Sequence, residues 1–73
     1  MTENRRSEDM LKQLREAKGM TQAALAEASG VSLRMIQYYE QGANDITKAE
    51  VMTIYRLAKA LGCQMEDIIK GED

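Results

Sequence analysis

The sequence contains no proline, tryptophan, phenylalanine or histidine, and it has a single cysteine, Cys63, among 73 residues. The lack of proline, together with many Ala, Leu, Met, Glu, Lys and Gln residues, favours a chain built from helices. The lack of histidine removes the commonest general base and metal ligand. One cysteine excludes an internal disulfide and a cysteine-rich zinc site. With no phosphate-binding glycine loop and no nucleophile–base pair either, we expect no enzyme, no metal and no other cofactor.

Long hydrophobic runs are also missing. No apolar stretch approaches the ~20 residues that span a bilayer, and residues 1–9 contain no hydrophobic signal segment. We therefore expect a cytoplasmic protein without a membrane partner. The length, with 44% hydrophobic and 30% charged residues, predicts one globular domain over 1–73. Its core is expected at about 8–70, with flexible ends at 1–6 and 71–73.

A large net charge is missing as well, because 10 basic residues nearly balance 12 acidic ones. The formal net charge is −2, which taken alone argues against a nucleic-acid partner. The acidic residues are concentrated at the ends, because residues 1–9 carry a net charge of −1 and residues 64–73 carry −3. Residues 10–63 carry +2. The middle of the chain is therefore weakly basic, which leaves both nucleic acid and protein open as partners.

Cap residues and apolar spacing predict a helix near the N-terminus. Ser7 is a suitable N-cap, and Gly19 is placed where a left-handed C-cap glycine belongs. Between them an apolar stripe recurs at helical spacing and consists of Met10, Leu11, Leu14 and Ala17.

Two short helices follow in close succession. Thr21 caps an alanine-rich helix over 22–28, which Gly30 ends, and Ser32 caps a helix over 33–40. Because only about three residues separate these helices and one of them is glycine, we expect a helix-turn-helix.

The second half of the chain predicts two more helices. Gly42 opens a loop over 41–46, and Thr47 with Glu50 forms a capping box for a helix over 48–61. The apolar face of that helix is expected to consist of Val51, Ile54, Leu57, Ala58 and Leu61. A final short helix over 64–70 would place Cys63 at its N-cap, as an inert and partly buried residue, and would contribute Met65, Ile68 and Ile69.

The helix-turn-helix residues resemble those of a known family. The stretch Thr21-Gln22-Ala23-Ala24-Leu25-Ala26-Glu27-Ala28-Ser29-Gly30-Val31-Ser32, with Ile36 and Tyr39-Glu40-Gln41-Gly42, is similar to the Cro and phage-repressor type of helix-turn-helix, the Xre-like family. The resemblance covers roughly residues 8–70. It implies an all-α, compact bundle of five short helices, the lambda-repressor-like DNA-binding domain.

The pattern of the third helix separates a core side from an outer side. Leu25, Val31, Ile36 and Tyr39 are expected in the core, and Ala26 is small because the third helix crosses over it. The outer face would then consist of Leu33, Arg34, Gln37, Tyr38 and Gln41, which three- and four-residue steps bring together. A face of this kind enters the DNA major groove in helix-turn-helix proteins.

Each exposed side chain of the third helix and its surroundings suggests a contact with DNA. Arg34 is expected to pair with guanine, Gln37 to contact adenine or a phosphate, and Leu33 to touch a thymine methyl. Tyr38 would reach a phosphate or pack against sugar. The resemblance implies a phosphate contact for Gln22, and the helix N-termini at Thr21 and Ser32 present N–H groups to phosphates. Asn44 and Lys48 are further candidates for backbone contacts.

The resemblance also implies an ion pair between Arg15 and Glu40, which would be structural and would not face DNA. The chain departs from the family pattern after Gly42, because the segment before the fourth helix is about three residues longer than usual. Ile46 occupies a position where proline is common. We expect an extra turn at the start of the fourth helix.

Two functions remain open at this stage. The first is a sequence-specific, double-stranded DNA-binding transcriptional regulator, which would act as a homodimer because such proteins bind paired half-sites. The dimer would use the exposed parts of Met65, Ile68 and Ile69, or would form only on DNA, and no small-molecule ligand is evident. The alternative is a protein-interaction module, such as an antitoxin or an anti-repressor. Salt dependence separates the two, because DNA affinity falls steeply with salt.

Overall fold

The computed structural model describes residues 7–69, and their side chains from Met10 onward. Within that range the chain forms five α-helices and one 3-10 turn and has no strand. The elements are α1 (Ser7–Ala17), α2 (Gln22–Ser29), α3 (Leu33–Gln41), η1 (Ile46–Lys48), α4 (Val51–Leu61) and α5 (Met65–Ile69). The predicted all-α bundle of five short helices is confirmed. The expected flexible ends, and the last residue of the expected fifth helix, Lys70, lie outside the described residues.

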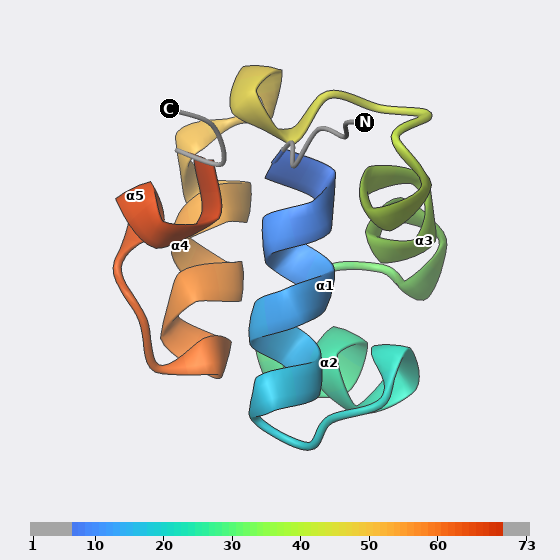
Figure 1. Ribbon diagram of the computed structural model, residues 1–73, viewed down its shortest axis with the longest axis vertical. Helices are drawn as coiled ribbons and strands as arrows, with labels where there is room; N and C mark the ends of the chain where they lie inside the picture. Colours follow the sequence, from blue (N-terminus) through green and yellow to red (C-terminus); the bar gives the residue numbers. More distant parts are fainter. Residues whose placement is uncertain (1–6, 70–73) are drawn as a thin grey trace, which may run out of the picture.

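The helices are arranged around α1, which runs through the middle of the molecule (Figure 1). α3 lies on one side of α1, α4 and α5 lie on the other, and α2 lies at the bottom of the view. α1 contacts α3 and α5, and α2 contacts both α3 and α4. α2 and α3 therefore pack against each other, and the pair is held by α1, which contacts α3, and by α4, which contacts α2.

The core collects one or more apolar residues from every element. The fully buried large side chains are Leu11, Leu25, Ile36, Ile46, Leu57 and Ile68. The four residues predicted for the core of the helix-turn-helix are all buried, and Ala26 packs against that core. Ala17, which the sequence assigned to the apolar stripe of α1, is exposed. The part of the stripe that packs on the core therefore ends at Leu14.

The start of α1 lies slightly earlier than predicted. Ser7 is the first residue of the helix itself, so the N-cap position falls before it, outside the described residues. The end of the helix is as predicted, because Gly19 adopts a positive φ of 76°. Its N–H donates to the carbonyl oxygen of Glu16 at 2.9 Å, which satisfies one of the carbonyls that a helix end leaves free.

The predicted capping box of the fourth helix is wrong. Thr47 donates both its backbone N–H (3.0 Å) and its hydroxyl (2.6 Å) to Oδ1 of Asp45, so Asp45 caps a separate 3-10 turn. The backbone then extends through Ala49 and Glu50, and α4 begins only at Val51. The expected extra turn therefore exists, but it is not part of the helix. Because Val51 is the first residue of α4, it is 67% exposed and not part of the core.

The fifth helix also differs in detail. It begins at Met65, so Gln64 and not Cys63 precedes it, and Oδ2 of Asp67 accepts a hydrogen bond from the N–H of Gln64 at 2.9 Å. Cys63 is half-buried, and burial together with the nearby Asp67 carboxylate raises the pKa of its thiol. Ile68 is fully buried, so it cannot belong to an exposed dimer surface as the sequence suggested.

The turn between α2 and α3 depends on Gly30, which has a φ of 79°. A Cβ added at Gly30 would meet no atom within 4 Å, so alanine is disfavoured there by its backbone conformation alone. We expect Gly30→Ala to lower the free energy of unfolding by about 1–2 kcal/mol, measured by thermal denaturation. Gly30→Asn should cost less, because asparagine tolerates the left-handed conformation better than alanine does. Equal stability of all three proteins would contradict this account of the turn.

Candidate nucleic-acid interface

The helix-turn-helix is closed by side-chain caps at the start of both helices. Oγ1 of Thr21 accepts a hydrogen bond from the N–H of Ala24 at 3.0 Å, and Oγ of Ser32 accepts one from the N–H of Met35 at 3.1 Å. Both caps were predicted from the sequence and are confirmed. The structure adds a third contact, because Oγ of the buried Ser29 accepts a hydrogen bond from the N–H of Val31 at 3.1 Å. The turn is thereby held by side chains that belong to it.

The outward side of α3 carries the side chains that the helical spacing predicted. Leu33, Arg34, Tyr38 and Gln41 are exposed, and Gln37 is half-buried. Leu33 is 40% exposed and Tyr38 is 36% exposed, whereas the neighbouring Tyr39 is 5% exposed. Tyr39 therefore lies in the core and Tyr38 on the outer face of α3, as predicted. Within residues 10–69, no hydrogen bond or ion pair engages the guanidinium of Arg34.

The segment after α3 brings two further candidate residues together. Asn44 and Lys48 line one shallow hollow of about 280 Å³, together with Tyr39, Asp45 and Ala49. Asn44 is half-buried and Lys48 is exposed. The N–H groups of Ala43 and Asn44 donate to the carbonyl oxygen of Tyr38 at 2.9 and 3.3 Å. The segment is therefore fixed to the end of α3.

A buried ion pair connects α1 with the end of α3. Nε and Nη2 of Arg15 donate to Oε2 and Oε1 of Glu40 at 2.7 and 3.0 Å, and the two side chains are only 10% and 4% exposed. The hydrogen bond to Glu40 raises the pKa of Arg15 above its ordinary value. The Arg15 guanidinium therefore keeps its charge, and the pair joins α1 to the last turn of α3.

Two more groups join this pair, and the sequence did not predict either of them. Nη1 of Arg15 donates to the carbonyl oxygen of Met20 at 2.8 Å. Nε2 of Gln22 donates to Oε1 of Glu40 at 2.9 Å, so this half-buried side chain is oriented by the ion pair. An amide nitrogen has two N–H groups, and within residues 10–69 only one of them has an acceptor. Arg15, Gln22 and Glu40 together fix the start of α2 and the end of α3 relative to α1.

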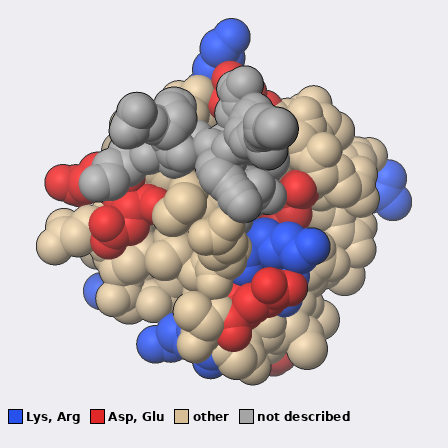
Figure 2. Space-filling model, viewed as in Figure 1, with Lys and Arg blue, Asp and Glu red and all other residues tan. Residues whose placement is uncertain are grey.

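Charges are mixed on the face that is shown in Figure 2, where basic and acidic side chains lie next to each other. Arg34 lies on the outer face of α3 and Lys48 lies in η1, where Asp45 precedes it. Glu40, one residue before the end of α3, is neutralised by the Arg15 guanidinium. Attraction for a polyanion is thus local and modest, and specific contacts have to supply most of the discrimination.

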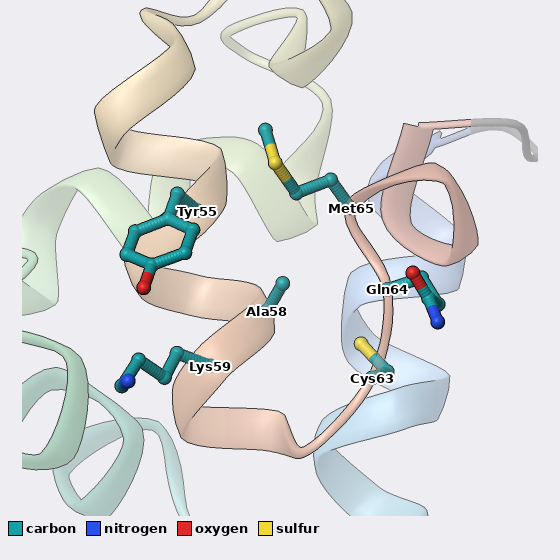
Figure 3. A pocket seen from close by; sticks show the side chains of 6 residues that line it. All are labelled: Tyr55, Ala58, Lys59, Cys63, Gln64 and Met65. Atoms are coloured by element: carbon teal, nitrogen blue, oxygen red, sulfur yellow. The ribbon is translucent and has the colours of Figure 1, made fainter.

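A second hollow lies between α4 and α5, on the other side of the molecule. Its volume is about 320 Å³, and Figure 3 shows its lining residues, which are Tyr55, Ala58, Lys59, Cys63, Gln64 and Met65. Nζ of Lys59 lies 5.8 Å from the centre of the Tyr55 ring. Within residues 10–69 no three His, Cys, Asp or Glu side chains are placed to hold a metal ion. None of the helices that the structure describes is long and apolar enough to cross a membrane.

The fold and the exposed face of α3 define a helix-turn-helix protein, and comparison with known proteins agrees. The model of the helix-turn-helix family HTH_3 matches residues 11–68, so the chain belongs to this family. No curated protein matches the sequence.

Solved structures give close structural matches. The P22 c2 repressor protein, crystallised with a synthetic operator, has a TM-score of 0.81 and 25% identity, covering 94% of this chain and 100% of that one. The restriction-modification controller protein C.AhdI from Aeromonas hydrophila has a TM-score of 0.77 and 28% identity, covering 86% and 91%. An HTH_3 family transcriptional regulator from Vibrio cholerae has a TM-score of 0.74 and 26% identity, covering 84% of this chain and 33% of that one. The family and these neighbours support a DNA-binding transcriptional regulator as the class of protein.

Proposed function

We propose that the protein is a sequence-specific regulator that inserts α3 into the major groove of double-stranded DNA. The observation that carries the proposal is the exposed outer face of α3, whose arginine has no partner within the described part of the chain. That face is presented by a helix whose two ends are fixed by caps and by the Arg15–Glu40 pair. The similar P22 c2 repressor protein was crystallised in complex with a synthetic operator, which supports DNA as the partner.

The proposed contacts divide into two kinds. Arg34 pairs with guanine, Gln37 contacts adenine or a phosphate, and Leu33 touches a thymine methyl, so these residues specify sequence. Tyr38 and Gln41 lie further along α3 and contact phosphate or sugar. The remaining contacts position the protein on the phosphates, through the helix starts at Thr21 and Ser32 and through Gln22, Asn44 and Lys48.

The proposal includes a homodimer. A single α3 contacts only a few base pairs, and helix-turn-helix proteins of this kind bind two half-sites about one helical turn apart. Two-fold symmetry of the protein then predicts an inverted repeat in the DNA. The alternative, a helix-turn-helix module that binds a protein such as a toxin, is favoured by the net charge of −2.

The test is selection of binding sites from a random duplex library at low and at near-physiological salt. We expect enrichment of a short inverted repeat with half-site centres about 10 base pairs apart. Affinity for the selected site should fall with salt, with a log–log slope of about −0.9 for each phosphate contacted. Binding without any enriched sequence would contradict specificity. No binding even at low salt would favour the protein-interaction module.

A further inference from the structure

The buried Tyr39 has a hydroxyl that the fold does not use. The residue is 5% exposed, and within residues 10–69 its hydroxyl takes part in no hydrogen bond. A phenol that is sealed into a core without a partner is costly, and no described side chain has a fully buried oxygen or nitrogen that lacks one. The hydroxyl therefore reaches the surface. The surface that Tyr39 lines is the hollow of about 280 Å³ at the end of α3.

Two further donors line the same hollow. Asn44 has an amide and Lys48 an ammonium, and neither side chain has a hydrogen-bond or ion-pair partner in the part of the chain that the structure describes. An ammonium only donates. Burial, together with the charge of Glu50, raises the pKa of Tyr39, so the phenol keeps its proton at neutral pH and can donate as well. Donors from α3, from the loop after it and from η1 thus line one hollow, which suits a group whose exposed atoms are all acceptor oxygens.

Two carboxylates near the hollow limit the charge that it can hold. Asp45 lines the hollow, and its Oδ1 accepts two hydrogen bonds from Thr47, at 3.0 and 2.6 Å, which direct that oxygen to the start of η1. Glu50 is exposed, and its side chain caps no N–H of α4. Next to these charges a phosphate monoester, which carries about −1.5 to −2 at pH 7, is disfavoured. A phosphodiester of a nucleic-acid backbone has a single negative charge and matches one ammonium with two neutral donors.

We propose that this hollow binds one phosphate of the DNA backbone, and that the hydroxyl of Tyr39 donates to it beside Asn44 and Lys48. The inference deepens the proposed function and rests on it. A helix that lies in the major groove ends beside a phosphate strand that borders the groove, and the hollow adjoins the C-terminal end of α3. Tyr39, which the sequence assigns only to the core, thereby also becomes a binding residue and supplies a donor without charge.

The first test is Tyr39→Phe in the full chain, which keeps the ring in the core and removes only the hydroxyl. Fluorescence anisotropy measures binding to the selected operator and to an unrelated duplex of equal length, at several salt concentrations. Affinity for both duplexes should fall about tenfold for each chain bound, because a hydrogen bond to a charged group is lost. The log–log slope of affinity against salt should not change, since a neutral donor releases no counterion. The melting temperature should stay the same or rise, because the hydroxyl has no partner in the fold.

Matched variants control for the chemistry and for the charge. Tyr55→Phe removes a hydroxyl from an exposed tyrosine of α4 and should leave DNA affinity unchanged. Glu50→Gln should raise affinity for every duplex about threefold, because it removes a carboxylate from beside the bound phosphate. Glu66→Gln makes the same change of charge on α5 and should have a smaller effect. Tyr39→Phe and Glu50→Gln thus act in opposite directions, although both substitutions lie at one hollow.

The outcomes separate this inference from the proposed function. If Tyr39→Phe binds DNA as tightly as the unmodified chain, the inference is overturned and the proposed function stands. A loss confined to the operator would also overturn it, because a phosphate contact contributes to all sequences. A loss of affinity together with a lower melting temperature would show that the hydroxyl supports the fold instead. The expected loss on every duplex, without any enriched sequence, would support the phosphate contact and overturn only the sequence-specific function. No binding to any duplex at low salt would overturn both.

Discussion

Replacing Arg15 with methionine is expected to lower the free energy of unfolding by about 3–5 kcal/mol, because it leaves the Glu40 carboxylate buried without its counter-ion. The Glu40 side chain is 4% exposed and would keep only the hydrogen bond from Gln22. The carbonyl oxygen of Met20 would also lose its donor. For a domain of this size, each kcal/mol corresponds to about 4–8 °C in melting temperature. We expect the variant to melt at least about 12 °C below the unmodified protein.

Two further variants make this prediction specific. Arg15→Met combined with Glu40→Gln should be more stable than Arg15→Met alone, because the amide carries no charge and still accepts the hydrogen bond from Gln22. Arg34→Met makes the same replacement at an exposed arginine and should change stability by less than about 0.5 kcal/mol. An unchanged melting temperature for Arg15→Met would show that the ion pair does not stabilise the fold.

Arg34→Ala is expected to have the converse effect, with a large loss of specific DNA binding and little loss of stability. Each lost bidentate contact to guanine costs about 1–3 kcal/mol of discrimination, and a dimer loses one contact in each half-site. Titration of the variant against the selected operator and against an unrelated duplex of equal length measures the specific and the non-specific affinity. The specific affinity should fall much more, and preference at one base pair of each half-site should disappear.

Lys48→Ala is the control for this experiment. A lysine that contacts phosphate contributes equally to the affinity for all sequences. Its loss should weaken binding to both duplexes alike and reduce the log–log slope of affinity against salt by about 1. If Arg34→Ala weakens binding to both duplexes equally, then Arg34 contacts phosphate and another residue of α3 specifies the sequence.

Most of the fold follows from local sequence because its helix ends are set by residues next to them. Thr21 and Ser32 have hydroxyls that fit an N-cap, and Gly19, Gly30 and Gly42 adopt the positive φ that helix ends favour. The start of α4 could not be predicted in the same way. The sequence offers two possible capping side chains two residues apart, Asp45 and Thr47, and the choice between them depends on Ile46. That residue anchors the 3-10 turn because it is fully buried, and an isolated apolar residue has no periodicity that reveals its burial.

The candidate site was predictable in outline for a different reason. Helical spacing alone decides which residues of α3 share a face, so its exposed side chains could be named before the structure was known. The contacts of Gln22 with Glu40 and of Arg15 with Met20 could not, because they join residues whose proximity depends on how three helices pack. The position of Val51 was mispredicted from spacing alone. It was assigned to the core, but it is the first residue of α4 and is 67% exposed.

The capping of α2 and α3 has a thermodynamic consequence for the encounter with DNA. Every cap of these helices is formed by a residue between 21 and 42, and the orientation of α3 is fixed by Arg15 and Glu40, so no DNA group is needed to order the motif. The helix-turn-helix motif therefore loses its conformational entropy when the chain folds and not when it binds DNA. Association then takes place between preformed surfaces and lacks the large heat-capacity change that accompanies coupled folding and binding. The affinity of such a motif is limited by the few contacts it makes and not by the cost of ordering it.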